Sequence, residues 1–114
     1  MTEISSDVIR GYNDTMILWT LLDAPSYGYE ISRKIRLVTE EKYVIKETTL
    51  YSAFLRLEKN GYIESFLARK DQEGNEKKRT YYRLTDAGRA YYLGKCEEWQ
   101  LTKDVVERFI RREE

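Results

Sequence analysis

The sequence predicts a mainly helical α+β fold, in which three helices are followed by a small β-hairpin and one long C-terminal helix. Three observations predict it. Apolar residues recur at helical spacing through the first sixty residues, two extended runs flank a polar turn at 69–79, and no proline follows residue 85. With 114 residues the chain holds one domain, or one domain and an appendage.

Composition narrows the possible functions. The chain has no histidine and a single cysteine, Cys96. It therefore lacks the residues for a Ser-His triad, a histidine zinc site or an intrachain disulfide, and we expect no enzyme, metal or cofactor. Its start lacks the basic region and apolar core of a secretory signal, and the apolar run 16–22 is shorter than the roughly 20 residues that span a bilayer. We expect a cytoplasmic protein without a membrane partner.

The first two helices are predicted at 7–23 and 27–39. The first carries many apolar side chains and ends before Pro25. Ser26 is placed to cap the second, whose inward face is formed by Ile31, Ile35 and Val38 at i, i+4 and i+7. The run 43–45 that follows suits one short strand.

A third helix is predicted at 48–60, ended by Gly61 in the left-handed conformation. Its apolar residues fall at i, i+3, i+4 and i+7, at Leu50, Ala53, Phe54 and Leu57. The other faces gather hydroxyl groups and cations, which can meet phosphates and base edges. These candidate DNA contacts are Thr48, Thr49, Tyr51, Ser52, Arg56 and Lys59. For the threonines and Ser52, plain helix capping is the structural alternative, and for Tyr51 it is packing over the hairpin.

Two extended runs, 62–68 and 80–84, predict a β-hairpin with a long charged tip at 69–79. Tyr81 and Tyr82 alternate, so one of them faces the core. Although the net charge is zero, residues 41–84 hold ten Lys or Arg against seven Asp or Glu. Positive charge concentrated in one segment is what a local phosphate contact needs, and we add Lys77, Lys78 and Arg79 to the candidates.

The last helix is predicted to start after Thr85, as N-cap, and to end near Arg112. Such a helix would be roughly 40 Å long, longer than a small domain is wide. Its apolar residues keep a spacing of 4, 3, 7 and 3, close to a coiled-coil seam. A second copy of the chain is the simplest cover for this seam, so we expect a homodimer with an interface at Tyr92, Cys96, Trp99, Val106 and Phe109.

Helix, helix, helix, hairpin is the order of a winged helix-turn-helix, whose third helix enters the DNA major groove while the hairpin, or wing, lies along the backbone. We expect residues 1–84 to form this DNA-binding domain and residues 85–114 to form the dimerisation helix. The N-terminal helix can also join the dimer interface.

Three segments resemble those of one family. TLYSAFLRLEKNGYI at 49–63 resembles the LYPALxRLExxGLI signature of PadR-family transcriptional regulators. RTYYRLTDAG at 79–88 is similar to that family's RKYYRLTxxG segment, and YGYEI at 27–31 is similar to its GYEI entry to the second helix. The single long C-terminal helix is similar to the compact, LmrR-like branch.

The resemblance implies a homodimeric repressor that binds a near-palindromic operator and is released by a small aromatic ligand at the dimer interface. It also implies that Trp99 meets its symmetry mate and sandwiches that ligand, whereas the plainer interpretation of Trp99 is packing in the seam. From their positions on the first helix, Trp19, Ile9 and Asp14 are expected to line the same cavity. The alternative function is a winged helix that docks a protein partner without specific DNA binding.

Overall fold

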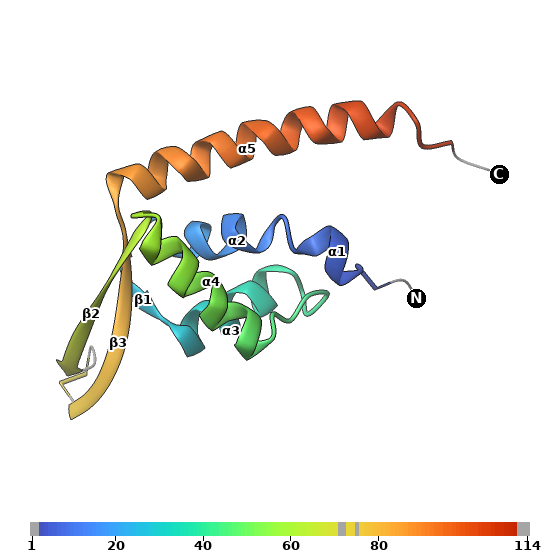
Figure 1. The fold of residues 1–114 in the computed structure, drawn as a ribbon. Coiled ribbons are helices and arrows are strands. Elements are labelled where there is room, and N and C mark those ends of the chain that lie inside the picture. The colour runs from blue at the N-terminus through green and yellow to red at the C-terminus, as the bar shows by residue number, and fades with distance from the viewer. Residues whose placement is uncertain (1–2, 71–72, 75, 112–114) are drawn as a thin grey trace.

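The predicted α+β order of helices, hairpin and long helix is confirmed by the computed structural model, which describes residues 3–70, 73–74 and 76–111 (Figure 1). The helices are α1 (Ser6–Ile9), α2 (Asn13–Thr20), α3 (Gly28–Val38), α4 (Glu47–Lys59) and α5 (Asp86–Glu107). The strands are β1 (Ser26–Tyr27), β2 (Ile63–Lys70) and β3 (Glu76–Leu84).

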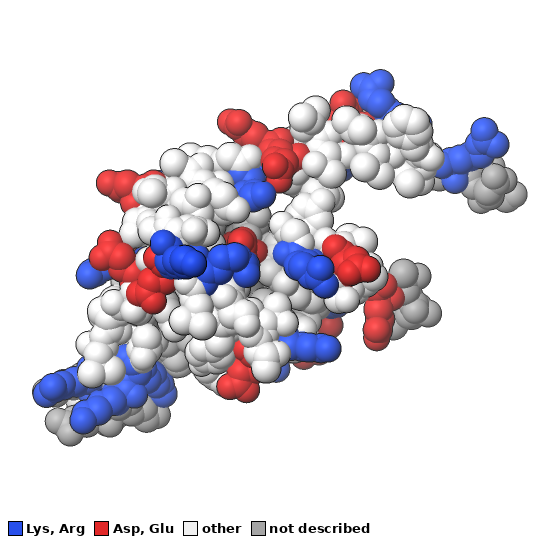
Figure 2. All heavy atoms as spheres, viewed as in Figure 1, with Lys and Arg blue, Asp and Glu red and all other residues white. Residues whose placement is uncertain are grey.

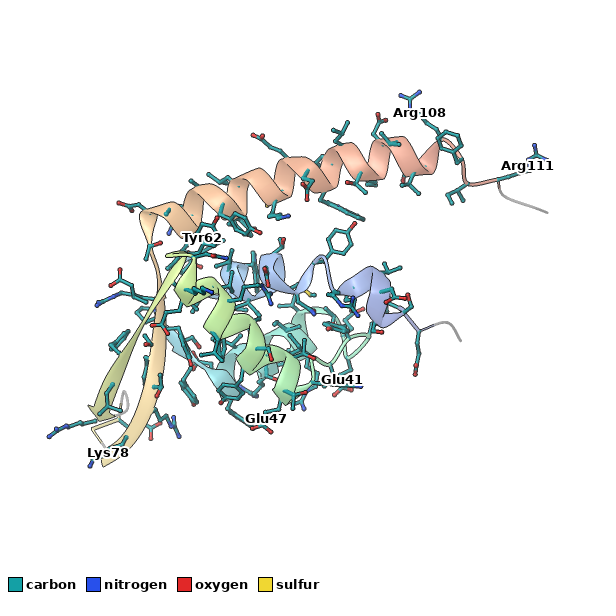
Figure 3. All side chains as sticks on the ribbon, in the orientation of Figure 1. Glu41, Glu47, Tyr62, Lys78, Arg108 and Arg111 are labelled. Atoms are coloured by element: carbon teal, nitrogen blue, oxygen red, sulfur yellow. The ribbon has the colours of Figure 1, made fainter. Side chains whose placement is uncertain are left out.

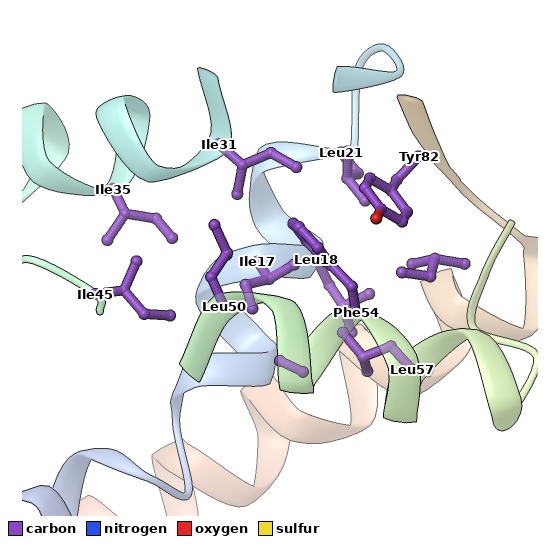
Figure 4. Close-up of a cluster of buried hydrophobic side chains, with 12 residues drawn as sticks. Ile17, Leu18, Leu21, Ile31, Ile35, Ile45, Leu50, Phe54, Leu57 and Tyr82 are labelled. Carbon is purple, nitrogen blue, oxygen red and sulfur yellow. The ribbon is translucent and has the colours of Figure 1, made fainter. Parts of the chain in front are cut away.

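Helices α2, α3 and α4 enclose one hydrophobic core, which the sheet closes at one end (Figure 4). All four predicted inward residues of α4 are at most 2% exposed. On α3, Ile31 and Ile35 are buried as predicted, but Val38 is 58% exposed because it lies in the last turn, past the edge of the core. The complete core consists of Ile17, Leu18, Leu21, Ile31, Ile35, Ile45, Leu50, Ala53, Phe54, Leu57, Ile63 and Tyr82.

The first predicted helix is in fact two. Helix α1 ends at Ile9 and α2 begins at Asn13, with Gly11 between them. Glycine disfavours a helix interior, and the Asn13 side chain is 4% exposed and accepts a hydrogen bond from the Tyr43 hydroxyl at 2.7 Å. Breaking the helix therefore lets α2 bury a polar side chain that still has a partner.

The sheet has three antiparallel strands in the order β1-β3-β2, with Ser26 opposite Tyr82 and Ser65 also opposite Tyr82. Strand β1 was not predicted, and the expectation that Ser26 caps the second helix is wrong: its hydroxyl donates to the Glu30 carboxylate, while the N-cap of α3 is Tyr27. Residues 43–45 form no strand, although Ile45 is buried. Tyr82 is the buried member of the alternating tyrosine pair, as expected.

Helix α5 begins as predicted, because Gly88 N–H donates to the Thr85 hydroxyl oxygen at 2.9 Å. It ends at Glu107, before the predicted end near Arg112. Its first half lies across α2, and its second half runs past the body of the molecule (Figure 1). The molecule measures 57 × 31 × 22 Å as a result.

Candidate nucleic-acid interface

The N-terminal half of α4 presents hydroxyl groups to solvent. Thr48 and Ser52 are exposed, Tyr51 is 45% exposed and Thr49 is half-buried. The helix starts at Glu47, and its N-cap, Lys46, makes no side-chain capping bond. The structural alternative of N-capping by Thr48 or Thr49 is therefore not what the structure has, and these hydroxyl groups remain available to an outside partner.

The cations of the last turns of α4 are placed differently. The Arg56 guanidinium forms an ion pair with the Asp14 carboxylate on α2, where the Asp14 side chain is 16% exposed. Arg56 is thereby held against the body of its own chain, while Lys59 is exposed at the end of α4. The candidate DNA contacts of α4 thus divide into an open N-terminal group, an Arg56 paired with Asp14, and an exposed Lys59.

A hollow of about 280 Å³ lies between α4 and the N-terminal helices. It contains two arginines, Arg56 and Arg10, beside the hydroxyl groups of the α4 N-terminus. Arg10 was not among the sequence candidates. Its exposed position next to α4 depends on the break between α1 and α2, which the predicted continuous helix concealed. The residues that line this hollow are Arg10, Asn13, Thr48, Thr49, Ser52, Ala53 and Arg56.

The hairpin carries positive charge to the far end of the molecule. Lys78 lies near its tip, and in Figure 3 both Lys78 and Glu47, at the start of α4, lie on the side away from α5. In Figure 2 Lys and Arg side chains gather at this hairpin end. Arg79 is half-buried with its guanidinium 4.3 Å from the centre of the Tyr27 ring. The side chain of Lys77 lies outside the described part of the structure.

A second hollow, of about 370 Å³, separates the base of the hairpin from α4. Tyr51 and Arg79, both predicted DNA contacts, lie in it together with Gly28, Thr80 and Tyr82, which were not predicted. The pairing of β1 with β3 brings these residues together, and a two-residue strand gives no periodic signal in the sequence. The full lining is Tyr27, Gly28, Tyr29, Tyr51, Arg79, Thr80 and Tyr82.

The four residues expected to line one ligand cavity are spread over the structure of the single chain. Trp99 packs edge-on against Tyr12, with ring centres 5.3 Å apart. Trp19 lines a largely apolar hollow of about 260 Å³ with the Lys34 ammonium 5.9 Å from its ring. Ile9 lines a separate hollow of about 590 Å³, and Asp14 is paired with Arg56.

The residues expected at the dimer interface also differ in environment. Tyr92 and Cys96 are half-buried by their own chain, and burial, followed by the hydrogen bond with Cys96, raises the pKa of the Tyr92 phenol. In contrast, Trp99, Val106 and Phe109 are 44%, 50% and 81% exposed. The open part of the predicted seam is therefore its C-terminal half.

Among the described residues, no helix is long and apolar enough to cross a lipid bilayer. Nor do those residues gather three or more His, Cys, Asp or Glu side chains in an arrangement that could hold a metal ion.

Comparisons with known proteins agree with this architecture. A transcriptional regulator from Clostridium thermocellum is 60% identical, with a TM-score of 0.84 over 93% of this chain and 100% of that one. A PadR family transcription regulator from Clostridium difficile is 33% identical, with a TM-score of 0.72 over 86% and 97% of the two chains. An uncharacterized protein from Lysinibacillus sphaericus is 41% identical over 107 residues, 94% of this chain and 95% of that protein.

The family description "Transcriptional regulator PadR-like family" matches residues 17–93, from the middle of α2 to the first half of α5. The match thus includes the exposed α4, the basic hairpin and the start of the long helix. The chain belongs to the PadR-like family of transcriptional regulators.

Proposed function

We propose that the protein is a homodimeric repressor that binds a specific DNA sequence. The observation that carries the proposal is that the start of α4, at Glu47, and the basic hairpin, at Lys78, lie on the same side of the molecule, away from α5 (Figure 3). The first turns of α4 also expose hydroxyl groups. An exposed helix can enter the major groove while a cationic hairpin follows the phosphates. The protein would act in the cytoplasm.

The dimer is supported by the distal half of α5. Trp99 and Val106, one heptad apart on the same face of α5, are 44% and 50% exposed. Phe109 and Ile110, which follow the end of the helix, are 81% and 65% exposed. Apolar side chains left open in this way indicate a protein partner, and a second copy of the same helix has the complementary surface. Two recognition helices related by a two-fold axis would read half-sites about 10 base pairs apart, or a multiple of that spacing.

We also propose that binding of a small aromatic ligand releases the protein from its operator. Trp99 is 44% exposed at the base of the open half of α5, beside Tyr12. In a dimer its free face would offer a flat aromatic surface for stacking. The ligand would lie between the two Trp99 side chains, with Trp19 and Ile9 as more distant neighbours. Quenching of tryptophan emission by a planar aromatic probe tests this role, and Trp99→Phe should abolish the quenching whereas Trp19→Phe should retain it.

Selection of bound duplexes from a random pool tests the DNA-binding function and yields the operator and the spacing of its half-sites. A salt titration on the selected duplex should show a steep loss of affinity, because bound phosphates release counterions. Failure to bind any duplex at low salt would favour the alternative, a winged helix that docks a protein. Sedimentation at micromolar concentration tests whether the protein is a dimer, because a species with the monomer mass of 13.7 kDa would refute the dimer.

A further inference from the structure

The hollow between the hairpin base and α4 contains donors without partners. Among the residues that the structure describes, neither the Tyr51 hydroxyl nor the Tyr82 hydroxyl has a hydrogen-bond partner. Tyr82 as a whole is only 8% exposed, but its hydroxyl oxygen reaches solvent through the hollow. Both phenols can therefore donate a hydrogen bond to a ligand that enters the hollow.

The backbone of α3 is shaped to admit the Tyr51 side chain. A Cβ atom built on Gly28 would lie 2.6 Å from the Tyr51 hydroxyl oxygen and 3.1 Å from the adjacent ring carbon. Any other residue at position 28 would therefore displace the hydroxyl group. Tyr51 is also fixed from the other side, by an edge-on contact with the Phe54 ring at 5.4 Å between centres.

Of the cations that the structure describes, Arg79 is held at the same place. Stacking on the Tyr27 ring orients the Arg79 guanidinium at the mouth of the hollow. Tyr27 is in turn tilted against Tyr81 on β3, with ring centres 5.3 Å apart. The cation therefore approaches the hollow on a rigid support, which lowers the conformational entropy lost when it binds an anion.

The Glu58 carboxylate, whose charge acts on Tyr82, already has hydrogen-bond partners in its own chain. The Glu58 carboxylate accepts hydrogen bonds from the Ser65 backbone N–H and the Ser65 hydroxyl. Burial, together with the nearby Tyr51 and Glu58, raises the pKa of Tyr82, so that this phenol stays protonated and can donate. Two phenol donors, the Thr80 hydroxyl and one guanidinium match the acceptor oxygens and single negative charge of a phosphodiester.

We propose that this hollow binds one backbone phosphate of the bound DNA, with Tyr51, Tyr82, Thr80 and Arg79 as its donors and Gly28 as the residue that makes room. The proposal rests on the DNA-binding function proposed above and adds Gly28, Thr80 and Tyr82 to it. This phosphate site would fix α4 in the major groove at a set distance from one strand, because the hairpin base and the recognition helix grip the same phosphate.

The first test compares two arginines of the same strand. Arg79 and Arg83 both lie on β3 and both stack on an aromatic ring, Arg83 on Phe66 at 5.0 Å, but only Arg79 lines the hollow. On a random-sequence duplex, Arg79→Gln should weaken binding about tenfold and reduce the slope of log affinity against log salt by about one. Arg83→Gln, with the same charge change, should leave that slope unchanged. Equal effects of the two variants would overturn the proposed phosphate site.

The second test concerns the donors. Tyr51→Phe with Tyr82→Phe should weaken duplex binding several-fold while circular dichroism stays that of the wild type. Gly28→Ala should weaken binding to a similar extent, although alanine favours a helix. If both variants bind as the wild type does, the hollow holds no phosphate. If instead the wild type binds no duplex, the proposed DNA-binding function has failed, which is a different result.

The third test locates the phosphate. After the operator has been selected, each phosphate in turn is replaced by a neutral methylphosphonate. At one position per half-site, the replacement should weaken duplex binding by the wild type but should not weaken binding by the Arg79→Gln variant further. Such non-additive effects are expected when Arg79 contacts that phosphate directly. The hollow could instead bind a free phosphate ion. Titration with inorganic phosphate, monitored by backbone amide chemical shifts, tests this alternative. Shifts at the hollow together with additive methylphosphonate effects would identify a site for free anions and overturn the proposed phosphate site for DNA.

Discussion

The two halves of α5 belong to one uninterrupted helix but have different environments. In the proximal half (residues 86–96), the Tyr91 ring stacks on Tyr62 at 4.1 Å and the Arg89 guanidinium donates to the Leu22 carbonyl oxygen at 2.8 Å. In the distal half (residues 97–107), Trp99 is 44% exposed and Val106 is 50% exposed. The apolar spacing is similar in both halves. The apolar periodicity of α5 therefore indicates that one face of the helix is buried against another surface. Only the tertiary contacts show whether that surface belongs to the same chain or to a partner.

The largest effect is expected where the proximal half is anchored. A Cβ atom on Gly88 would lie 2.0 Å from the Tyr62 carbonyl oxygen, a backbone atom that cannot move freely because it also accepts from Thr85 N–H. Gly88→Ala should therefore lower the free energy of unfolding by roughly 3 kcal/mol or more, or prevent folding. Chemical denaturation measures the loss.

Gly94 supplies the matched control on the same helix. Nothing lies within 4 Å of a Cβ atom built there, so Gly94→Ala should leave the chain folded and raise its stability by up to about 1 kcal/mol. If Gly88→Ala were as harmless as Gly94→Ala, the close contact between α5 and the body would not exist as described.

The second prediction concerns the distal half and the apolar residues that directly follow it. Val106→Glu combined with Phe109→Glu places two charges on the exposed apolar surface, which should weaken self-association at least 100-fold, or about 3 kcal/mol, while the body stays folded. Sedimentation reports the association and circular dichroism reports the fold. Glu97→Lys, at an exposed position on the opposite face of the same helix, is the control and should remain associated. A dimer unaffected by the double change would have to use another surface.

Much of the body could be predicted because its signals are local. The stripe of α4 and the Thr85 cap depend on residues within a few positions of one another, and both are confirmed. The break at Gly11 was missed because it depends on Tyr43, thirty residues away, which donates to Asn13. The division at residue 84 stays a prediction, and the proximal half of α5 packs closely on the body that precedes it.

The sequence predicted many of the residues of the candidate site, but it did not predict how they are arranged in space. Hydroxyl groups on α4 and cations on the hairpin could be read from the sequence, whereas the hollow that joins Tyr51 to Arg79 requires the pairing of β1 with β3. The pairing of Arg56 with Asp14 was equally hidden, because the two residues are far apart in the chain and each has a plausible separate role. Long-range contacts of this kind leave no periodic trace.

The third prediction concerns the contact between the start of the distal half of α5 and the rest of the chain. Trp99 and Tyr12 form an edge-on aromatic pair. A double-mutant cycle with Tyr12→Leu and Trp99→Leu should give a coupling energy of about 0.5–1.5 kcal/mol. The cycle is measured by denaturation in the Val106→Glu, Phe109→Glu background, so that only contacts within one chain contribute. A coupling of zero would place the boundary between the two halves before Trp99.

The smallest expected effect is a pH dependence in the proximal half. Burial, and then Cys96, raises the pKa of Tyr92 above its ordinary value of 10.0. In the unfolded chain the phenol ionises at the ordinary pKa, whereas the folded chain retains the proton, so this contribution to stability is present below pH 10.0 and is lost as the pH rises through the folded pKa. Denaturation at pH values from about 9 to 11 should show a smaller alkaline loss for Tyr92→Phe than for the wild type. Cys96→Ala removes the second cause and should give an intermediate loss, because burial remains. If Tyr92→Phe followed the wild-type curve, the Tyr92 phenol would be open to solvent, and the proximal half would be no better covered by its own chain than the distal half.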